Sequence, residues 1–160
     1  MARRILKILH ELGAIGLTGA LASHMILLAT APDDSLADYA IVRRNIEAIS
    51  GWLLVPSLAI ALVSGLLAMA VSSPFQNAGW VWAKAILGLP MLEGTLATID
   101  STAQHAAALS AQAAAGDADP ALLSEMLARE WQALWIIMAL AIAQTVLGVW
   151  RPRRRRRRSA

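Results

Sequence analysis

The sequence contains no cysteine. This absence excludes disulfide bonds, thiolate metal sites and thiol catalysis. The sequence also has no Walker loop, no Rossmann glycine pattern, no serine-triad motif and no zinc-protease helix motif. Any activity must therefore come from other groups, or from a cofactor that the chain binds.

Apolar residues dominate what is present. They make up 58% of the 160 residues, which exceeds the share expected in a soluble domain of this size. The excess positive charge is concentrated at the two ends, in Arg3, Arg4 and Lys7 and in the arginine run 153–158. We interpret these clusters as membrane topology signals, with the C-terminal run as a possible anchor for anionic lipid and no role in nucleic-acid binding.

The basic ends also predict the orientation. Lys and Arg next to a membrane span are retained on the cytoplasmic side, so both termini are expected there and the number of spans must be even. We predict four spans, at roughly 5–29, 52–71, 80–99 and 131–150, followed by a cytoplasmic tail at 151–160. The expected location is the bacterial inner membrane. The first apolar segment contains the pattern Ala20-Leu21-Ala22, which a signal peptidase could accept, but it continues to Ala29 and we expect a retained anchor.

Local signals predict where helices begin and end. Ser35-Leu36-Ala37-Asp38 resembles a capping box, Ser72–Gly79 predicts a tight hairpin, Gly116 predicts a helix end and Asp119-Pro120 predicts a helix start. Pro56 and Pro90 lie inside predicted spans and should perturb them. The fold class is therefore all-α, a four-transmembrane-helix bundle with helices extended on the outer side.

Ionisable residues within predicted spans are the first functional candidates, because an unpaired charge in lipid is costly. His10 and His24 are 14 residues apart, which places them on nearly the same helix face at about 21 Å. Two histidines so spaced, with small residues between them, are how b-type cytochromes hold two haems on one helix. Gly13, Leu17 and Ala20 would then leave room for a flat macrocycle. Alternatively, each histidine is only a hydrogen-bonded polar group near an interface.

Depth in the membrane suggests partners for these histidines. His10 and Lys84 share a depth near the inner boundary, and Glu93 is the expected hydrogen-bond partner of His24. His105 lies further out than His24, which disfavours one iron binding both but does not exclude it, because a shift of two turns in the predicted boundaries or a kink at Pro90 would bring them together. The pair Arg43-Arg44 could bind a propionate, phosphate or lipid head group, or could be solvated or bridged to Glu47.

Three segments carry a family resemblance: Ile8-Leu9-His10-Glu11-Leu12-Gly13, Trp52-Leu53-Leu54-Val55-Pro56 with Val63-Ser64-Gly65, and Trp82-Ala83-Lys84. They resemble an uncharacterised bacterial family of four-span membrane proteins, the domain-of-unknown-function family number 2269. The layout is also similar to HemJ-type protoporphyrinogen oxidases, in which a first-span His and a later Lys matter for haem-linked activity. That resemblance assigns these roles to His10 and Lys84. The sequence departs from it at Leu89, Pro90 and Glu93, where HemJ proteins tend to carry further His and Tyr.

These observations lead to a haem-b-binding redox or electron-transfer protein as the first hypothesis. His10 and His24 are the candidate iron ligands, and the candidate cofactor-binding residues are His10, His24, Lys84, Glu93 and His105. The expected partners are the lipid bilayer and either an outer redox protein or further copies of the chain. Two alternatives remain: a cofactor-free accessory or scaffold subunit, and an oligomeric transporter of a small solute or metal ion.

Overall fold

The computed structural model describes residues 1–71 and 79–150, and within these ranges every regular element is a helix. The elements in chain order are α1 (Ala2–Ala29), α2 (Leu36–Ile49), the π-helical segment η1 (Ser50–Leu54), α3 (Val55–Ala70), α5 (Gly79–Gly94), the π-helical segment η2 (Thr95–Asp100), α6 (Ser101–Ala115) and α7 (Ala121–Trp150). Two predicted segments lie outside the described residues: residues 72–78 of the turn at Ser72–Gly79, and the tail at 151–160.

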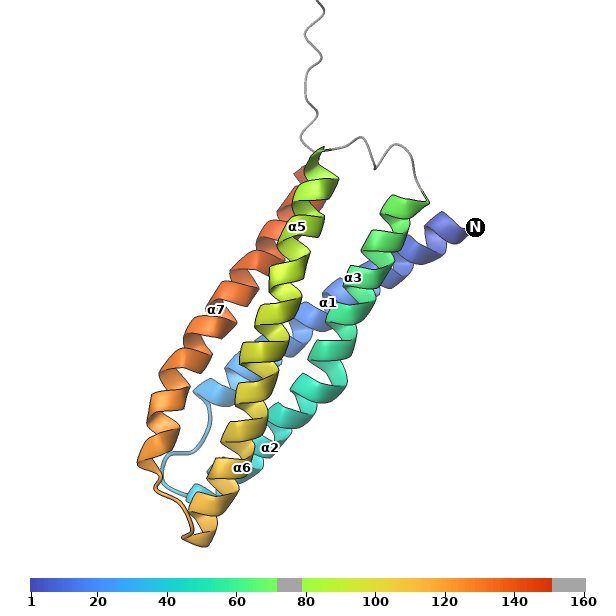
Figure 1. Ribbon diagram of the computed structural model, residues 1–160. Coiled ribbons are helices and arrows are strands. Elements are labelled where there is room, and N and C mark those ends of the chain that lie inside the picture. The colour runs from blue at the N-terminus through green and yellow to red at the C-terminus, as the bar shows by residue number, and fades with distance from the viewer. Residues whose placement is uncertain (72–78, 151–160) are drawn as a thin grey trace, which may run out of the picture.

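The helices form a bundle of long antiparallel rods (Figure 1). Segment η1 joins α2 to α3, and η2 joins α5 to α6, so each of these pairs runs on as one rod. We call the end where α1 and α5 begin the N-terminal end, and the opposite end, formed by α2 and α6, the crown. The all-α prediction is thereby confirmed.

The predicted count of four spans is not confirmed. Three described helical stretches are long and apolar enough to cross a membrane: Ala2–Ala29, Leu36–Ala70 and Ala121–Val149. The rod that begins with α5 is not among them. It carries Lys84 and Glu93 within its apolar part, and charged residues weaken a span signal more than any other type.

Three predicted helix ends are confirmed, each with a visible cause. The Asp38 backbone N–H donates to Ser35 Oγ over 3.3 Å at the start of α2, and the Ala121 N–H donates to Asp119 Oδ1 over 2.9 Å at the start of α7. Helix α6 ends at Gly116, whose φ of 85° is a left-handed conformation that glycine adopts without steric cost. These caps place the two turns that join the rods at the crown.

Both internal prolines lie close to a wider helical turn. Pro56 follows η1. There the Val55 N–H bonds to the carbonyl of Ser50, five residues before it, and not to the carbonyl four residues before it as in an α-helix. Pro90 lies inside α5, a few residues before η2, where the Ser101 N–H bonds to the Leu96 carbonyl. A π turn inserts one extra residue into the helix and changes the face that later residues present.

Helices α1 and α3 approach so closely that their backbones touch. A Cβ atom on Gly13 would lie 2.6 Å from the Ala61 nitrogen and 2.7 Å from the Ser57 carbonyl oxygen. A Cβ on Gly16 would collide with Ser57 Oγ. Small residues of this kind allow close helix contact in lipid, where burial of apolar surface contributes little. The α1–α3 pair therefore forms a firm wall on which the functional residues of α1 are placed.

Candidate functional site

A cavity of about 780 Å³ lies at the N-terminal end of the bundle, between α1, α3, α5 and α7. Most of its wall is apolar and comes from residues such as Leu17, Leu58, Leu62, Val81, Met91 and Ala141. Its polar side chains are Arg3, Arg4, Lys7, His10, Glu11, Thr18, Lys84, Gln144 and Thr145. An apolar body with a few convergent polar groups is the usual form of a small-molecule site.

The His10 imidazole is held in a defined orientation. Its Nδ1 lies 2.7 Å from the Ala61 carbonyl oxygen, which can only accept a hydrogen bond, so Nδ1 carries the proton. Gly65 makes this position possible, because a Cβ there would lie 3.3 Å from the same nitrogen. In the neutral ring the lone pair then belongs to Nε2, which can bind a metal or accept a proton.

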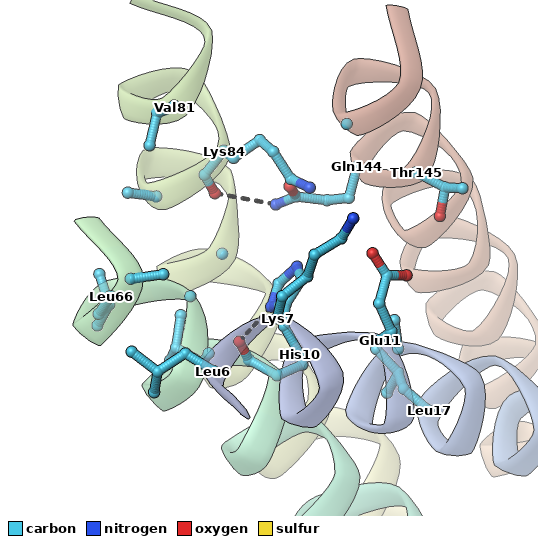
Figure 2. A pocket seen from close by; sticks show the side chains of 18 of the residues that line it. Leu6, Lys7, His10, Glu11, Leu17, Leu66, Val81, Lys84, Gln144 and Thr145 are labelled. Atoms are coloured by element: carbon cyan, nitrogen blue, oxygen red, sulfur yellow. Dashed lines mark hydrogen bonds between the residues drawn. The ribbon is translucent and has the colours of Figure 1, made fainter. Parts of the chain in front are cut away.

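Lys84 enters the same cavity from α5. Its ammonium nitrogen lies 3.1 Å from the position of a Cβ on Gly148, so it packs closely against the backbone of α7. The Gln144 side-chain amide donates to the Lys84 carbonyl over 3.0 Å and joins α5 to α7 at this level. Figure 2 shows Lys7, Glu11 and Lys84 directed toward one space between the helices. The structure thus brings His10 and Lys84 together, as their matching depth predicts.

The cavity is strongly cationic. Arg3, Arg4, Lys7 and Lys84 line it, and Glu11 is the carboxylate among its lining residues. Glu11 is also near enough to Lys84 to attract its positive charge. Low-dielectric walls strengthen such a field. The cavity therefore favours a ligand that combines an apolar body with anionic groups.

His24 lies elsewhere, in a buried ion cluster made of His24, Arg43 and Glu130. These residues are 1%, 0% and 2% exposed. His24 Nε2 lies 2.9 Å from Glu130 Oε1, and Arg43 Nη1 donates to Glu130 Oε2 over 2.5 Å. The cluster joins α1, α2 and α7, because each of these helices contributes one member.

Tyr39 completes the surroundings of Arg43. The Arg43 Nε donates to the Tyr39 hydroxyl over 2.8 Å, and the guanidinium carbon lies 5.1 Å from the centre of the Tyr39 ring. Arg43 is thus paired through Nη1, hydrogen-bonded through Nε and stacked on an aromatic ring, which offsets much of the cost of burying a guanidinium. The expectation that Arg43 is solvated or bridged to Glu47 was wrong, because its helix face turns into the core.

Two expectations about His24 are corrected. Its partner is Glu130 and not Glu93, which is exposed on α5. The helix face that carries Gly13 leaves no room for a macrocycle, because the backbone of α3 occupies that space. His105 is exposed on α6 and does not line the cavity.

The sequence did not lead us to predict Glu130 as a partner of His24, because it precedes Trp131 at the expected membrane boundary. Its signal was nevertheless present. In α7 the buried residues Leu123, Glu130, Leu134, Ile137 and Ala141 recur at helical spacing on one face. A carboxylate within such a stripe is expected in the core, and a core carboxylate needs a cationic partner.

Comparison with known proteins assigns a family and no more. Within the described residues no group of three or more His, Cys, Asp or Glu side chains is arranged to hold a metal ion. No curated protein and no solved structure matches the chain, so the similarity to HemJ-type oxidases stays a prediction. A family model described as "Predicted integral membrane protein (DUF2269)" matches residues 4–152. This match covers nearly the whole chain, and the protein therefore belongs to that family of integral membrane proteins.

Proposed function

We propose that the protein crosses the bacterial inner membrane four times, with both termini in the cytoplasm. Helix α5 packs against α3 and α7, which both belong to candidate spans. A rod enclosed by spans shares their depth, and the bond from Gln144 of α7 to the Lys84 carbonyl joins two polar groups away from lipid. The basic residues Arg3, Arg4 and Lys7, which line the cavity, then lie on the cytoplasmic side.

Reporter fusions test this topology. An enzyme active only in the periplasm is fused after Gly116 in one protein and after Ala160 in another. The two fusions should report opposite sides, because the single rod α7 lies between the two fusion points. Fusions that report the same side would contradict the four-span topology.

We further propose that the cavity binds haem b and that the protein acts in membrane redox or electron-transfer chemistry. The observation that carries this proposal is the fixed His10 tautomer. An imidazole whose Nδ1–H is bound to a backbone carbonyl is the usual arrangement of a histidine metal ligand, with Nε2 left for the metal. His10 is the residue that would hold the iron.

The rest of the cavity fits the same group. A volume of about 780 Å³ is within the range of cofactor sites, and the walls are mostly apolar. Haem b carries two propionates, for which Arg3, Arg4 and Lys7 are suitable partners at the cavity edge. Lys84 faces the same space from α5 and would contact the group from the opposite wall. When bound, haem supplies one-electron chemistry that the side chains lack.

The visible spectrum of the full chain, purified in detergent after expression with a haem precursor, tests the proposal. The parent protein should show a Soret band, and His10→Ala should lose most of it. His105→Ala is the matched control, because this histidine is exposed on α6 and should leave the band unchanged. A folded parent protein without a Soret band, or equal bands in all three proteins, would contradict haem binding.

A cofactor-free accessory or scaffold subunit is the second candidate. The observation in its favour is that α1, α2 and α7 are already joined by the buried ion cluster without any ligand. Such a protein would give no Soret band, and it would copurify with a membrane complex from its native host. The same spectrum therefore separates the two functions.

A further inference from the structure

Five buried polar atoms lack a hydrogen-bond partner among the residues that the structure describes. They are His24 Nδ1, Arg43 Nη2, Ser50 Oγ, Thr95 Oγ1 and Asp100 Oδ1. His24, Arg43, Ser50 and Thr95 are at most 1% exposed. Buried polar groups in native proteins are almost always hydrogen-bonded, to protein or to ordered water, because an unbonded one is costly.

Helix register places three of these residues, His24, Ser50 and Asp100, at one level of the bundle, and Arg43 reaches that level through its bond to Glu130. Gly16 contacts Ser57 across the antiparallel α1–α3 pair, and moving eight residues along each chain places His24 beside residue 49, next to Ser50. Gly88 contacts Leu62 across the α3–α5 pair, and moving twelve residues along each places Asp100 opposite Ser50.

The same counting places residues of α7 at this level. Gly94 contacts Ile137 across the α5–α7 pair, and moving six residues along each places Asp100 beside residue 131, next to Glu130. All four rods thus contribute polar side chains to one level. We call this level the polar layer and define it by His24, Arg43, Ser50, Thr95, Asp100 and Glu130.

The polar layer coincides with both π turns. Ser50 begins η1 and Thr95 begins η2, and the two segments contact each other inside the bundle. π turns are rare, and they are retained mostly where a site requires them. Ser50 lies opposite Asp100 on this register, and Thr95 lies about 7.5 Å of helical rise before Asp100 on the same rod. Both hydroxyls are buried, and neither finds a protein partner among the described residues.

The chemistry of the five atoms identifies what they bind. Arg43 Nη2 can only donate, Asp100 Oδ1 can accept, the Ser50 and Thr95 hydroxyls can do both, and His24 Nδ1 donates or accepts according to its tautomer. A metal cation would satisfy the acceptors and be repelled by Arg43. An anion would satisfy the donors and be repelled by Asp100 and Glu130. Water donates and accepts, so it alone satisfies the whole set.

We propose that the polar layer is an internal water-binding site, in which ordered water molecules link the ion cluster on α1, α2 and α7 to the π turns η1 and η2. This site is separate from the cavity at the N-terminal end, because none of its six residues lines that cavity. The proposal is independent of haem binding.

Isosteric removal of one hydroxyl tests the proposal. Thr95→Val keeps the side-chain shape and removes the group that would bond to water. If water is bound, the unfolding equilibrium constant of the protein in mixed micelles should rise about fivefold or more, since a hydrogen-bonded group is lost. Thr98→Val is the matched control, because Thr98 belongs to η2 but is exposed and bonds to the Gly94 carbonyl. If the layer is dry, Thr95→Val should be as stable as the parent protein or more stable, and this result would overturn the proposal.

A second measurement keeps the test independent of mutant folding. Hydroxyl-radical footprinting of the parent protein labels buried side chains next to bound water and leaves dry core residues unlabelled. Residues of the polar layer should be labelled, whereas the core residues Leu21 and Leu134, which are fully buried, should not. Equal absence of label at both places would also overturn the proposal.

Discussion

Two regions of the bundle, the cavity at the N-terminal end and the polar layer, use histidine in opposite ways. At the N-terminal end, His10 gives one nitrogen to a backbone carbonyl and faces a cavity of about 780 Å³ with cationic walls. In the polar layer, His24 is fully buried and binds a carboxylate that also holds Arg43. The first region contains an open cavity with a cationic wall, and the second joins three helices. A histidine in a membrane helix is thus informative only when its partner is known.

The comparison predicts that the largest loss of stability comes from the polar layer. Glu130→Ala would leave the Arg43 guanidinium buried without its carboxylate, which should cost about 3–5 kcal/mol in the free energy of unfolding. Equilibrium unfolding in mixed micelles measures this loss. Glu125→Ala is the control, because that carboxylate is exposed on the same helix.

The double variant Arg43→Met with Glu130→Leu sharpens this result. It removes both charges together, and replacing a complete buried ion pair by apolar residues is often neutral or stabilising. It should therefore recover much of the stability lost in Glu130→Ala. If the single variant is as stable as the parent protein, the ion cluster does not hold the helices together.

A substitution in the α1–α3 contact should cause an intermediate loss in the free energy of unfolding. Gly13→Ala places a Cβ 2.6 Å from the Ala61 nitrogen, so α1 and α3 must separate. We expect a loss of about 1–3 kcal/mol in the free energy of unfolding, as for overpacked cores. Gly19→Ala is the control, because nothing lies within 4 Å of its Cβ position. Equal stability of the two variants would show that the α1–α3 contact is looser than described.

The smallest loss of stability is expected at the cavity. In protein prepared without haem, His10→Ala removes one half-buried hydrogen bond to the Ala61 carbonyl, which should cost about 0.5–1.5 kcal/mol in the free energy of unfolding. The same unfolding assay measures it, with His105→Ala as the exposed control. A loss as large as that of Glu130→Ala would contradict the distinction between a ligand cavity and a structural cluster.

Part of the candidate site was predictable from the sequence. His10 and Lys84 share a depth counted from the basic N-terminus and from the predicted start of the third span, and the structure places both at one cavity. Depth depends only on helical rise, which is constant along a helix. The partner of His24 depends also on helix rotation and on where each helix meets the membrane boundary, and for these reasons Glu93 was predicted in place of Glu130. Two π turns, which the sequence analysis did not predict, also change that rotation.

The sequence by itself determined the helical class, the caps at Ser35, Gly116 and Asp119, and the membrane character of the chain, because these follow from local hydrogen bonding and from the solvation of apolar surface. Only the tertiary structure decided which polar residues meet. Arg43 and Glu130 are 87 residues apart in the sequence and form one ion pair, because a buried charge requires a partner of opposite charge. Likewise, the close backbone contact at Gly13 depends on how α3 packs against α1. Pairing of this kind depends on the rotation and register of whole helices, which no local pattern specifies.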